Sequence, residues 1–174
     1  MITSMSNLFR YNLKTTEQTV PLEQELKVVQ DYTYIQKMRF GSRIRYDCQI
    51  QVDGAAVRLP AFTLQPLVEN AIVHGIAKKE QGGRVFLRVW QRGQMLIVSV
   101  ADTGVGMEEE LRQQLFDSVK DRNTSRVGIG LGNIYQRIQT MYQGGWMKVY
   151  GKKGQGTVIQ IGIPREEPAM EERS

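Results

Sequence analysis

Leu64-Gln65-Pro66-Leu67-Val68-Glu69-Asn70-Ala71-Ile72-Val73-His74-Gly75 is the stretch of this 174-residue chain that says most about its fold. Its apolar residues recur at three- and four-residue spacing, which predicts a helix over about Thr63–Ala77. Pro66, Asn70 and His74 fall on one stripe of that helix. An Asn carboxamide oxygen suits Mg²⁺ as a ligand, although a lone Asn or a lone histidine in a helix is more often structural.

Two glycine-containing motifs follow this helix. Asp102-x-Gly104-x-Gly106 comes after an almost wholly apolar strand, where an acid can accept a hydrogen bond and glycines let the backbone approach a ligand closely. Gly128-x-Gly130-x-Gly132 opens another helix, so its amides and the helix dipole favour an anion such as a phosphate. A Walker P-loop is excluded because Asn133 and Ile134 follow the last glycine, and the spacing also excludes a dinucleotide motif.

In the rest of the chain, the hydrophobic pattern alternates between helical and strand periods. The first 20 residues are expected to be irregular, and a helix is predicted from Pro21 to about Phe40, where Gly41 suits a C-terminal cap. We expect Cys48 to be buried on the apolar face of the first strand. The predicted strands are Ile44–Val52, Val85–Gln91, Met95–Ala101, Trp146–Tyr150 and Thr157–Ile163.

This order of elements predicts an α+β fold, a two-layer α/β sandwich in which helices cover one face of a mixed, mostly antiparallel sheet. A polar segment at about 107–127 is interpreted as a lid.

The composition of the chain excludes several kinds of site. The chain has one histidine and one cysteine, which excludes multi-histidine or multi-cysteine metal sites and an internal disulfide. A net charge of +5 with scattered Lys and Arg favours an ordinary solvated surface over a nucleic-acid site. No apolar run is long enough to span a membrane, and no signal peptide is recognisable, so we expect a cytoplasmic setting and no direct membrane contact.

Taken together and in this order, the motifs resemble those of the GHKL superfamily of gyrase, Hsp90-type, sensor-kinase and mismatch-repair ATP-binding domains. Glu69-Asn70 is similar to its N box, Asp102-x-Gly104-x-Gly106 to its G1 box, and Gly128-x-Gly130-x-Gly132 to its G2 box. The resemblance spans about Leu59–Pro164 and implies the Bergerat-type ATP-binding fold. The sequence of residues 64–72, together with Leu22-Glu-x-Glu-Leu26, resembles the corresponding sequences of LytS-like sensor histidine kinases.

The resemblance implies ATP and Mg²⁺ as ligands and assigns roles to individual residues. Asn70 would bind Mg²⁺ with help from Glu69, and His74 would lie near the phosphates. Asp102 would accept from the adenine amino group, with Thr157 close to it. The adenine pocket would be shaped by Gly104 and Gly106, and the phosphates would be lined by Gly128, Gly130, Leu131 and Gly132.

Two departures from the family pattern are informative. Hydrolysing members carry a carboxylate four residues before the N-box Asn, where this chain has Pro66, so phosphoryl transfer is favoured over hydrolysis. The family's phosphoacceptor histidine lies upstream in a motif that is absent here. Residues 1–41 are therefore interpreted as the remnant of a dimerisation region, 42–164 as the ATP-binding catalytic domain and 165–174 as a polar tail.

The expected protein is the catalytic part of a larger sensor histidine kinase. Its expected partners are an upstream phosphoacceptor helix of the same receptor and the receiver domain of a response regulator. We expect a homodimer in the full-length protein, anchored in the bacterial inner membrane with this domain on the cytoplasmic side. The alternatives are a nucleotide-binding interaction module without kinase activity and an anti-sigma-type serine kinase, which the Leu22–Phe40 segment disfavours.

Overall fold

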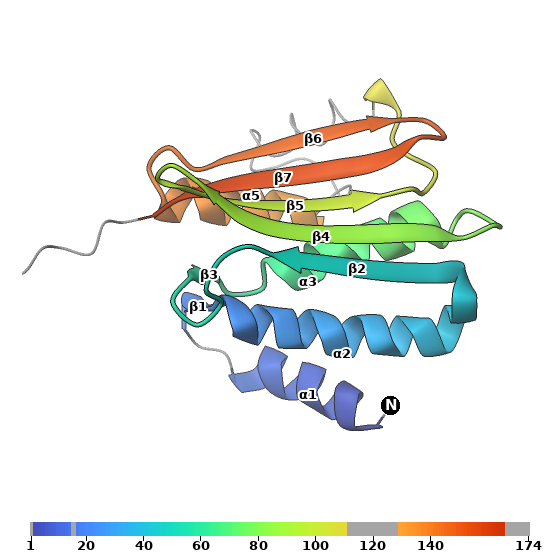
Figure 1. Cartoon of the computed structure of the whole chain (residues 1–174), viewed down its shortest axis with the longest axis horizontal. Helices are drawn as coiled ribbons and strands as arrows, with labels where there is room; N and C mark the ends of the chain where they lie inside the picture. Colours follow the sequence, from blue (N-terminus) through green and yellow to red (C-terminus); the bar gives the residue numbers. More distant parts are fainter. Residues whose placement is uncertain (1, 15–16, 111–128, 166–174) are drawn as a thin grey trace, which may run out of the picture.

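Five strands form the main sheet of the computed structural model, which describes residues 2–14, 17–110 and 129–165. The strand order is β2-β4-β5-β7-β6 (Figure 1), with β2 parallel to β4 and every other neighbouring pair antiparallel. This arrangement confirms the predicted mixed, mostly antiparallel sheet. The strands are β2 (Ile44–Ile50), β4 (Gly83–Arg92), β5 (Met95–Asp102), β6 (Trp146–Lys152) and β7 (Gly156–Pro164).

Helices pack against one face of this sheet, which confirms the two-layer α+β class. In Figure 1, α3 (Leu64–Glu69) and α5 (Ile129–Met141) lie behind the strands. A π-helix, η2 (Asn70–Ile76), continues α3 and contacts β4, β5 and β7. The long helix α2 (Leu22–Phe40) contacts α3 and the edge strand β2, and α1 (Ile2–Lys14) packs on α2. The 3₁₀ turn η1 (Gly41–Arg43) connects α2 to β2.

The core lies between the sheet and the helices. β5 is buried along nearly its whole length because strands flank it on both sides. Alternate residues of β4, Val85, Leu87 and Val89, are fully buried, as the period of two in a half-buried strand requires. Ile72 of η2 is fully buried in the same cluster. Each such side chain stabilises the fold by about 1.5–3 kcal/mol relative to an exposed one.

The boundaries of α2 follow the sequence prediction. The helix begins directly after Pro21 and ends at Phe40. Gly41 then takes a positive φ of 61° while its amide donates to the carbonyl of Lys37. A side chain at that left-handed position would be strained, so the glycine sets the end of the helix.

The prediction that the first 20 residues are irregular is wrong. Residues 2–14 form α1, and Thr19–Pro21 form a short strand, β1, which pairs with β3 (Arg58–Pro60). Ser4 and Tyr11 are buried and Leu8 is partly buried. Their four- and three-residue spacing is helical, but the pattern includes a serine and a tyrosine, so a search for apolar residues passes over it.

The prediction that Cys48 is buried is also wrong, because its side chain is exposed. It lies on the edge strand β2, where Tyr46 and Ile50 are only partly buried. Alternation along a strand shows which residues share a face, but it does not show whether another layer covers that face.

The helix predicted over Thr63–Ala77 is present, but its geometry changes at Asn70. The segment is α-helical as far as Glu69 and π-helical from Asn70 to Ile76, with the Ala77 amide donating to Ile72 O at 2.8 Å. The predicted four-residue stripe therefore does not continue with α-helical spacing to His74. π-helical turns are rare and occur frequently at functional sites.

Several expectations concern residues outside the described ranges. The lid expected at about 107–127 is described only for 107–110, where a helix begins at Glu109. Gly128 and the tail residues 166–174 also lie outside the described ranges.

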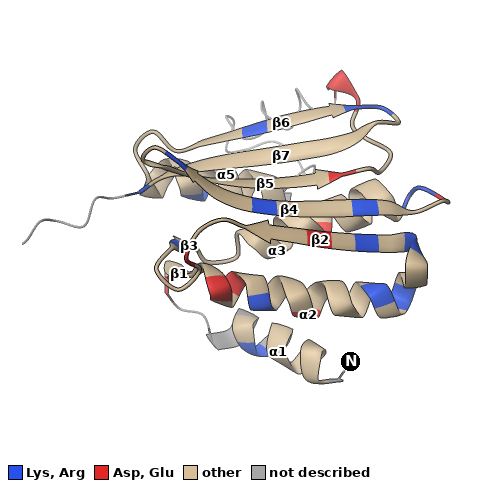
Figure 2. Ribbon diagram, in the orientation of Figure 1, with Lys and Arg blue, Asp and Glu red and all other residues tan. Residues whose placement is uncertain are grey.

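Within the described ranges, no helix is both long and apolar enough to cross a bilayer. In the ribbon of Figure 2, Lys and Arg positions are spread over several strands and helices, with Asp and Glu positions among them.

Candidate functional site

A buried carboxylate marks the end of the central strand. Asp102 is the last residue of β5, and it is only 8% exposed. Its Oδ1 accepts a hydrogen bond from the Gly104 amide at 2.8 Å. Burial raises the pKa of Asp102, while the amides of Gly104 and Thr157 and the charge of Lys79 act in the opposite direction. The carboxylate is thus a hydrogen-bond acceptor in poorly hydrated surroundings, where an acceptor is most selective for a donor on a ligand.

Several glycines pack so closely around Asp102 that a residue with a side chain would not fit at their positions. A Cβ atom at Gly75 would lie 2.6 Å from Asp102 Oδ1, and one at Gly104 would lie 2.2 Å from the carbonyl carbon of Gly75. Gly156 has a φ of +88°, and a Cβ atom there would lie 1.9 Å from Asp102 O. The backbones of η2 and of the loop after β5 therefore meet beside the Asp102 carboxylate, and that of β7 lies against the Asp102 main-chain carbonyl.

The loop after β5 is fixed on both sides. The Val105 amide donates to Gly75 O at 3.2 Å, and the Val105 carbonyl accepts from the Gly154 amide at 2.7 Å. Gly106 has a φ of +72°, and a Cβ atom there would lie 2.0 Å from Lys152 O. The G1-like motif is thus a rigid bridge between η2 and the turn that joins β6 to β7.

The N-box residues lie on the helix that touches Asp102. Asn70, the first residue of η2, is half-buried, whereas Glu69 and His74 are exposed. Gly75 of the same π-helix contacts the Asp102 carboxylate, so the N-box and G1-box motifs lie on adjoining elements. Thr157 is buried and pairs directly with Asp102 across β5 and β7.

The first turn of α5 lies beside the first turn of α3. A Cβ atom at Gly130 would be 4.0 Å from Pro66 Cβ. Gly130 is exposed, Gly132 is half-buried and Leu131 is buried in the core. The structure thus brings the described part of the G2-like motif next to the N-box helix, with the two glycines accessible and Leu131 anchoring the helix.

Two residues near the site were not assigned a role in the sequence analysis. Gly75 provides the space for the Asp102 carboxylate, and a glycine inside an apolar helix is itself a signal of close packing. Lys79 donates from Nζ to Thr103 O at 2.9 Å and contributes positive charge near Asp102. Its position depends on the chain turning after η2, which no local motif in the sequence indicates.

The arrangement offers a buried hydrogen-bond acceptor and, beside it, an oxygen ligand for a hard cation. Close contact with Gly75 and the hydrogen bond from the Gly104 amide hold the Asp102 carboxylate in a fixed position. Asn70 offers a hard oxygen ligand, and Mg²⁺ is commonly held by one or two protein groups together with phosphates and water.

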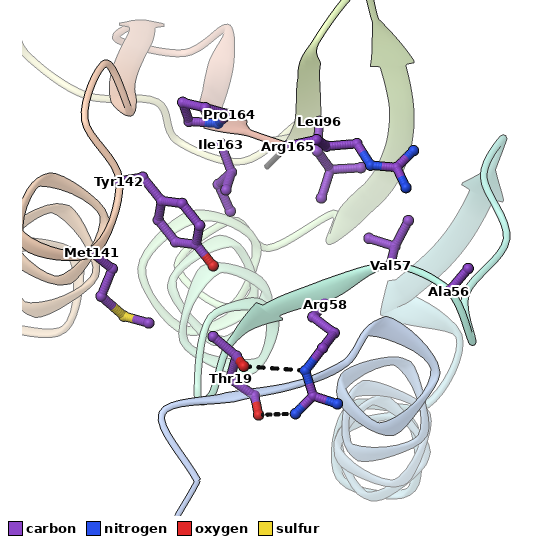
Figure 3. Close-up of a pocket in the computed structure, with 10 residues that line it drawn as sticks. All are labelled: Thr19, Ala56, Val57, Arg58, Leu96, Met141, Tyr142, Ile163, Pro164 and Arg165. Carbon is purple, nitrogen blue, oxygen red and sulfur yellow. Dashed lines mark hydrogen bonds between the residues drawn. The ribbon is translucent and has the colours of Figure 1, made fainter. Parts of the chain in front are cut away.

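A separate cavity of about 330 Å³ lies between the β1–β3 ribbon and the ends of α5 and β7. Figure 3 shows Tyr142 pointing into it and Arg58 turned toward Thr19. Arg58 donates to Thr19 Oγ1 at 3.1 Å and to Thr19 O at 2.5 Å. None of the site residues predicted from the sequence lines this cavity.

Comparison with protein families identifies the family of this chain. Residues 56–167 match the model described as "Histidine kinase-, DNA gyrase B-, and HSP90-like ATPase", and residues 1–44 match the model described as "Histidine kinase". The chain belongs to the first of these families.

Individual relatives agree with this assignment. The chain is 28% identical over 165 residues to the sensor protein kinase HptS of Staphylococcus aureus, covering 94% of this chain and 32% of HptS. It therefore spans about a third of the length of this curated relative.

Solved structures show the same fold. The catalytic domain of the histidine kinase ThkA has a TM-score of 0.63 at 20% identity, with 84% of this chain and 94% of that chain covered. The histidine kinase domain of the Erythrobacter litoralis EL346 blue-light activated kinase has a TM-score of 0.56 at 21% identity, with 94% and 76% covered.

Proposed function

We propose that this domain binds Mg-ATP at the site around Asp102 and transfers the γ-phosphoryl group to a histidine supplied by another segment. The observation that carries the proposal is the buried Asp102 carboxylate at the end of β5, which lies against the backbone of Gly75 and accepts from the Gly104 amide. The solved structure of full-length ShkA in complex with AMPPNP matches this chain with a TM-score of 0.60 at 20% identity and supports a nucleotide ligand.

Each site residue has a proposed role. Asp102 accepts from the adenine amino group, while Gly104 and Gly106 shape the adenine pocket and Thr157 supports Asp102 from β7. Asn70 holds Mg²⁺ with the help of Glu69, and His74 lies toward the phosphates. The phosphate-binding residues are Gly128, Gly130, Leu131 and Gly132. Mg²⁺ would neutralise charge on the phosphates.

The transfer requires the domain to position the γ-phosphoryl group and the attacking imidazole more than to activate either of them chemically. An imidazole nitrogen forms a bond to the γ-phosphorus, the bond from that phosphorus to the bridging oxygen breaks, and ADP leaves with the electron pair. Pro66 occupies the position where hydrolysing relatives carry a carboxylate. Because proline can neither accept a proton nor orient water through a side-chain oxygen, transfer to a protein nucleophile is favoured over hydrolysis.

The wider assembly follows from the same proposal. Residues 1–41 belong to the dimerisation and phosphoacceptor region, 42–164 form the catalytic domain and 165–174 form a tail. The full-length protein is a membrane-anchored homodimer with this domain in the cytoplasm. The phosphohistidine then passes its phosphoryl group to an aspartate of a response-regulator receiver domain.

Calorimetric titration of AMPPNP, with Mg²⁺ and with EDTA, tests the binding step. We expect saturable binding that Mg²⁺ strengthens and that Asp102→Asn abolishes. Absence of binding to the wild-type protein at millimolar AMPPNP would contradict the site assignment.

The transfer step is tested by supplying a histidine-bearing sensor-kinase helix in trans with radiolabelled ATP. Acid-labile, base-stable phosphate on that helix is expected. Acid-stable phosphate on serine would instead favour the serine kinase, and nucleotide binding without any transfer would favour an interaction module.

A further inference from the structure

Glu25 is a buried carboxylate whose partners lie far away in the sequence. It is in the first turn of α2 and is only 1% exposed. Its Oε2 accepts from the amides of Thr63 at 2.9 Å and Leu64 at 2.7 Å, and its Oε1 accepts from the amide of Phe62 at 2.8 Å. These amides lie at the start of α3, where a helix leaves its first N–H groups without backbone partners. Glu25 therefore caps the helix that carries the N box, although it belongs to another helix.

The capped turn is held by side chains from two further helices. The Tyr11 hydroxyl of α1 donates to Glu25 Oε1, and the Tyr11 ring packs on the Phe62 ring with centroids 4.9 Å apart. Arg137 of α5 donates to Ala61 O. We call this group the Glu25 cluster, and its members are Tyr11, Glu25, Ala61, Phe62, Thr63, Leu64 and Arg137.

Backbone strain at Phe62 shows that the cluster imposes a conformation. Phe62 has a φ of 59°, and among the described residues it is the only one other than glycine with a positive φ. A bulky residue in this region is strained and persists only where its surroundings hold it. The Glu25 carboxylate accepts from the Phe62 amide, and the Tyr11 ring packs on the Phe62 ring, so both hold this conformation.

The cluster contacts both helices that reach the proposed nucleotide site, α3 at its start and α5 at Arg137. α3 runs without a break from Leu64 to Glu69 and leads directly into Asn70, about 9 Å away at the helical rise. Arg137 lies two turns along α5 from Gly130. A shift of α2 relative to the turn at 61–64 would therefore change where α3 presents Asn70.

We propose that Glu25 is a positioning residue for the nucleotide site, acting through α3 to place Asn70 for the metal-bound nucleotide. The inference rests on the proposed function and adds a mechanical connection to it. Glu25 does not itself touch nucleotide. Its effect falls chiefly on the Mg²⁺-dependent part of binding, because Asn70 directly follows α3. Asp102 is held in the sheet by β4 and β7 and meets η2 at Gly75, five residues beyond Asn70.

The test compares Glu25→Gln with a matched control, Glu23→Gln, in the same first turns of α2. Glu23 is exposed and is not part of the Glu25 cluster. For each variant and for the wild type, the affinity for AMPPNP is measured by calorimetry with Mg²⁺ and with EDTA. Glu25→Gln keeps the size of the side chain but replaces one acceptor oxygen with a donor facing backbone amides.

We expect Glu25→Gln to reduce the enhancement of affinity by Mg²⁺ by about fivefold or more, the lower end of ordinary coupling between sites. Its affinity in EDTA should stay near the wild-type value, and Glu23→Gln should match the wild type in both conditions. Hydrogen exchange without nucleotide gives an independent readout, in which peptides covering 62–72 should exchange faster in Glu25→Gln alone.

A lower melting temperature with an unchanged Mg²⁺ enhancement would overturn the proposal and leave Glu25 a purely structural cap. An equal loss of affinity with Mg²⁺ and with EDTA would overturn it as well. If Glu25→Gln does not fold, Tyr11→Phe decides, because it removes one hydrogen-bond donor and keeps the ring. A smaller loss in the same direction supports the proposal, and an unchanged enhancement contradicts it. Failure of the wild-type protein to bind AMPPNP would be a failure of the proposed function instead.

Discussion

The Asp102 carboxylate lies directly against the backbone of Gly75, so closely that a Cβ atom at Gly75 would stand 2.6 Å from Asp102 Oδ1. Real Cβ atoms essentially never approach an oxygen this closely. The π-helix that follows Asn70 and the strand that ends at Asp102 are thus in contact through a position that only glycine can occupy without a shift.

Gly75→Ala should displace either η2 or the Asp102 side chain. Overpacking of this kind typically costs about 1–3 kcal/mol, which corresponds to about 2–4 °C in melting temperature per kcal/mol for a chain of this size. AMPPNP affinity should fall as well, because the displaced carboxylate is the proposed adenine acceptor. Circular dichroism melting and calorimetry measure the two effects.

Gly54→Ala is the matched control for this substitution. A Cβ atom at Gly54 would be 3.6 Å from Glu23 Cβ, an ordinary contact. Its melting temperature and AMPPNP affinity should stay near the wild-type values. Equal effects of the two substitutions would contradict the close contact between Gly75 and Asp102.

Two glycines at the start of β7 separate backbone strain from steric exclusion. Gly154 and Gly156 both have positive φ, +79° and +88°, but a Cβ atom has open space at Gly154 and would lie 1.9 Å from Asp102 O at Gly156. Gly154→Ala should lower the free energy of unfolding by about 1–2 kcal/mol from left-handed strain alone. Gly156→Ala should cost clearly more, and urea unfolding of both variants checks the order. Similar losses would mean that the contact with the Asp102 carbonyl is not rigid.

The raised pKa of Asp102 predicts a pH dependence of stability. Because burial raises this pKa above its unfolded value, the native state binds more protons than the unfolded state between the two pKa values. The contribution of Asp102 to the free energy of unfolding is therefore fully present below the unfolded pKa of about 3.9 and is lost as pH rises through the folded pKa.

Asp102→Asn removes this titration. The stability of the variant relative to wild type, measured by urea unfolding without nucleotide, should shift in favour of the variant as pH rises from about 4 to about 7. Comparing slopes rather than absolute stabilities removes the effect of any altered hydrogen bond. A difference that does not change with pH would contradict the burial of this carboxylate.

Cys48 should react with Ellman's reagent in the folded protein, since its side chain is exposed. Partial desolvation raises the pKa of the thiol, so less thiolate is present near neutral pH than in a free cysteine. The reaction should therefore be slower than that of the unfolded chain at pH 8 and should approach it as the pH is raised. Reaction only after addition of urea would indicate that Cys48 is buried.

Local patterns in the sequence were sufficient for most elements of the fold. The ends of α2 depend on neighbours within a few residues, and the apolar run of β5 is visible in the sequence itself. The structure agrees with the predictions for both. The motifs also appear in the order that places Asp102, Asn70 and Gly130 on adjoining elements, as the structure shows for the described residues.

Contacts between distant segments decided the features of the structure that local patterns did not predict. Glu25 reads in the sequence as an acidic residue suited to the start of its own helix, yet the tertiary structure buries it as the cap of α3, 38 residues from Thr63. α1 is stabilised by packing on α2, and Cys48 is exposed because β2 is an edge strand. The sequence by itself determined the elements and the motifs, because hydrophobic period and glycine conformation are local properties. Only the tertiary structure decided which faces are covered and which amides Glu25 satisfies, because burial depends on what another part of the chain places there.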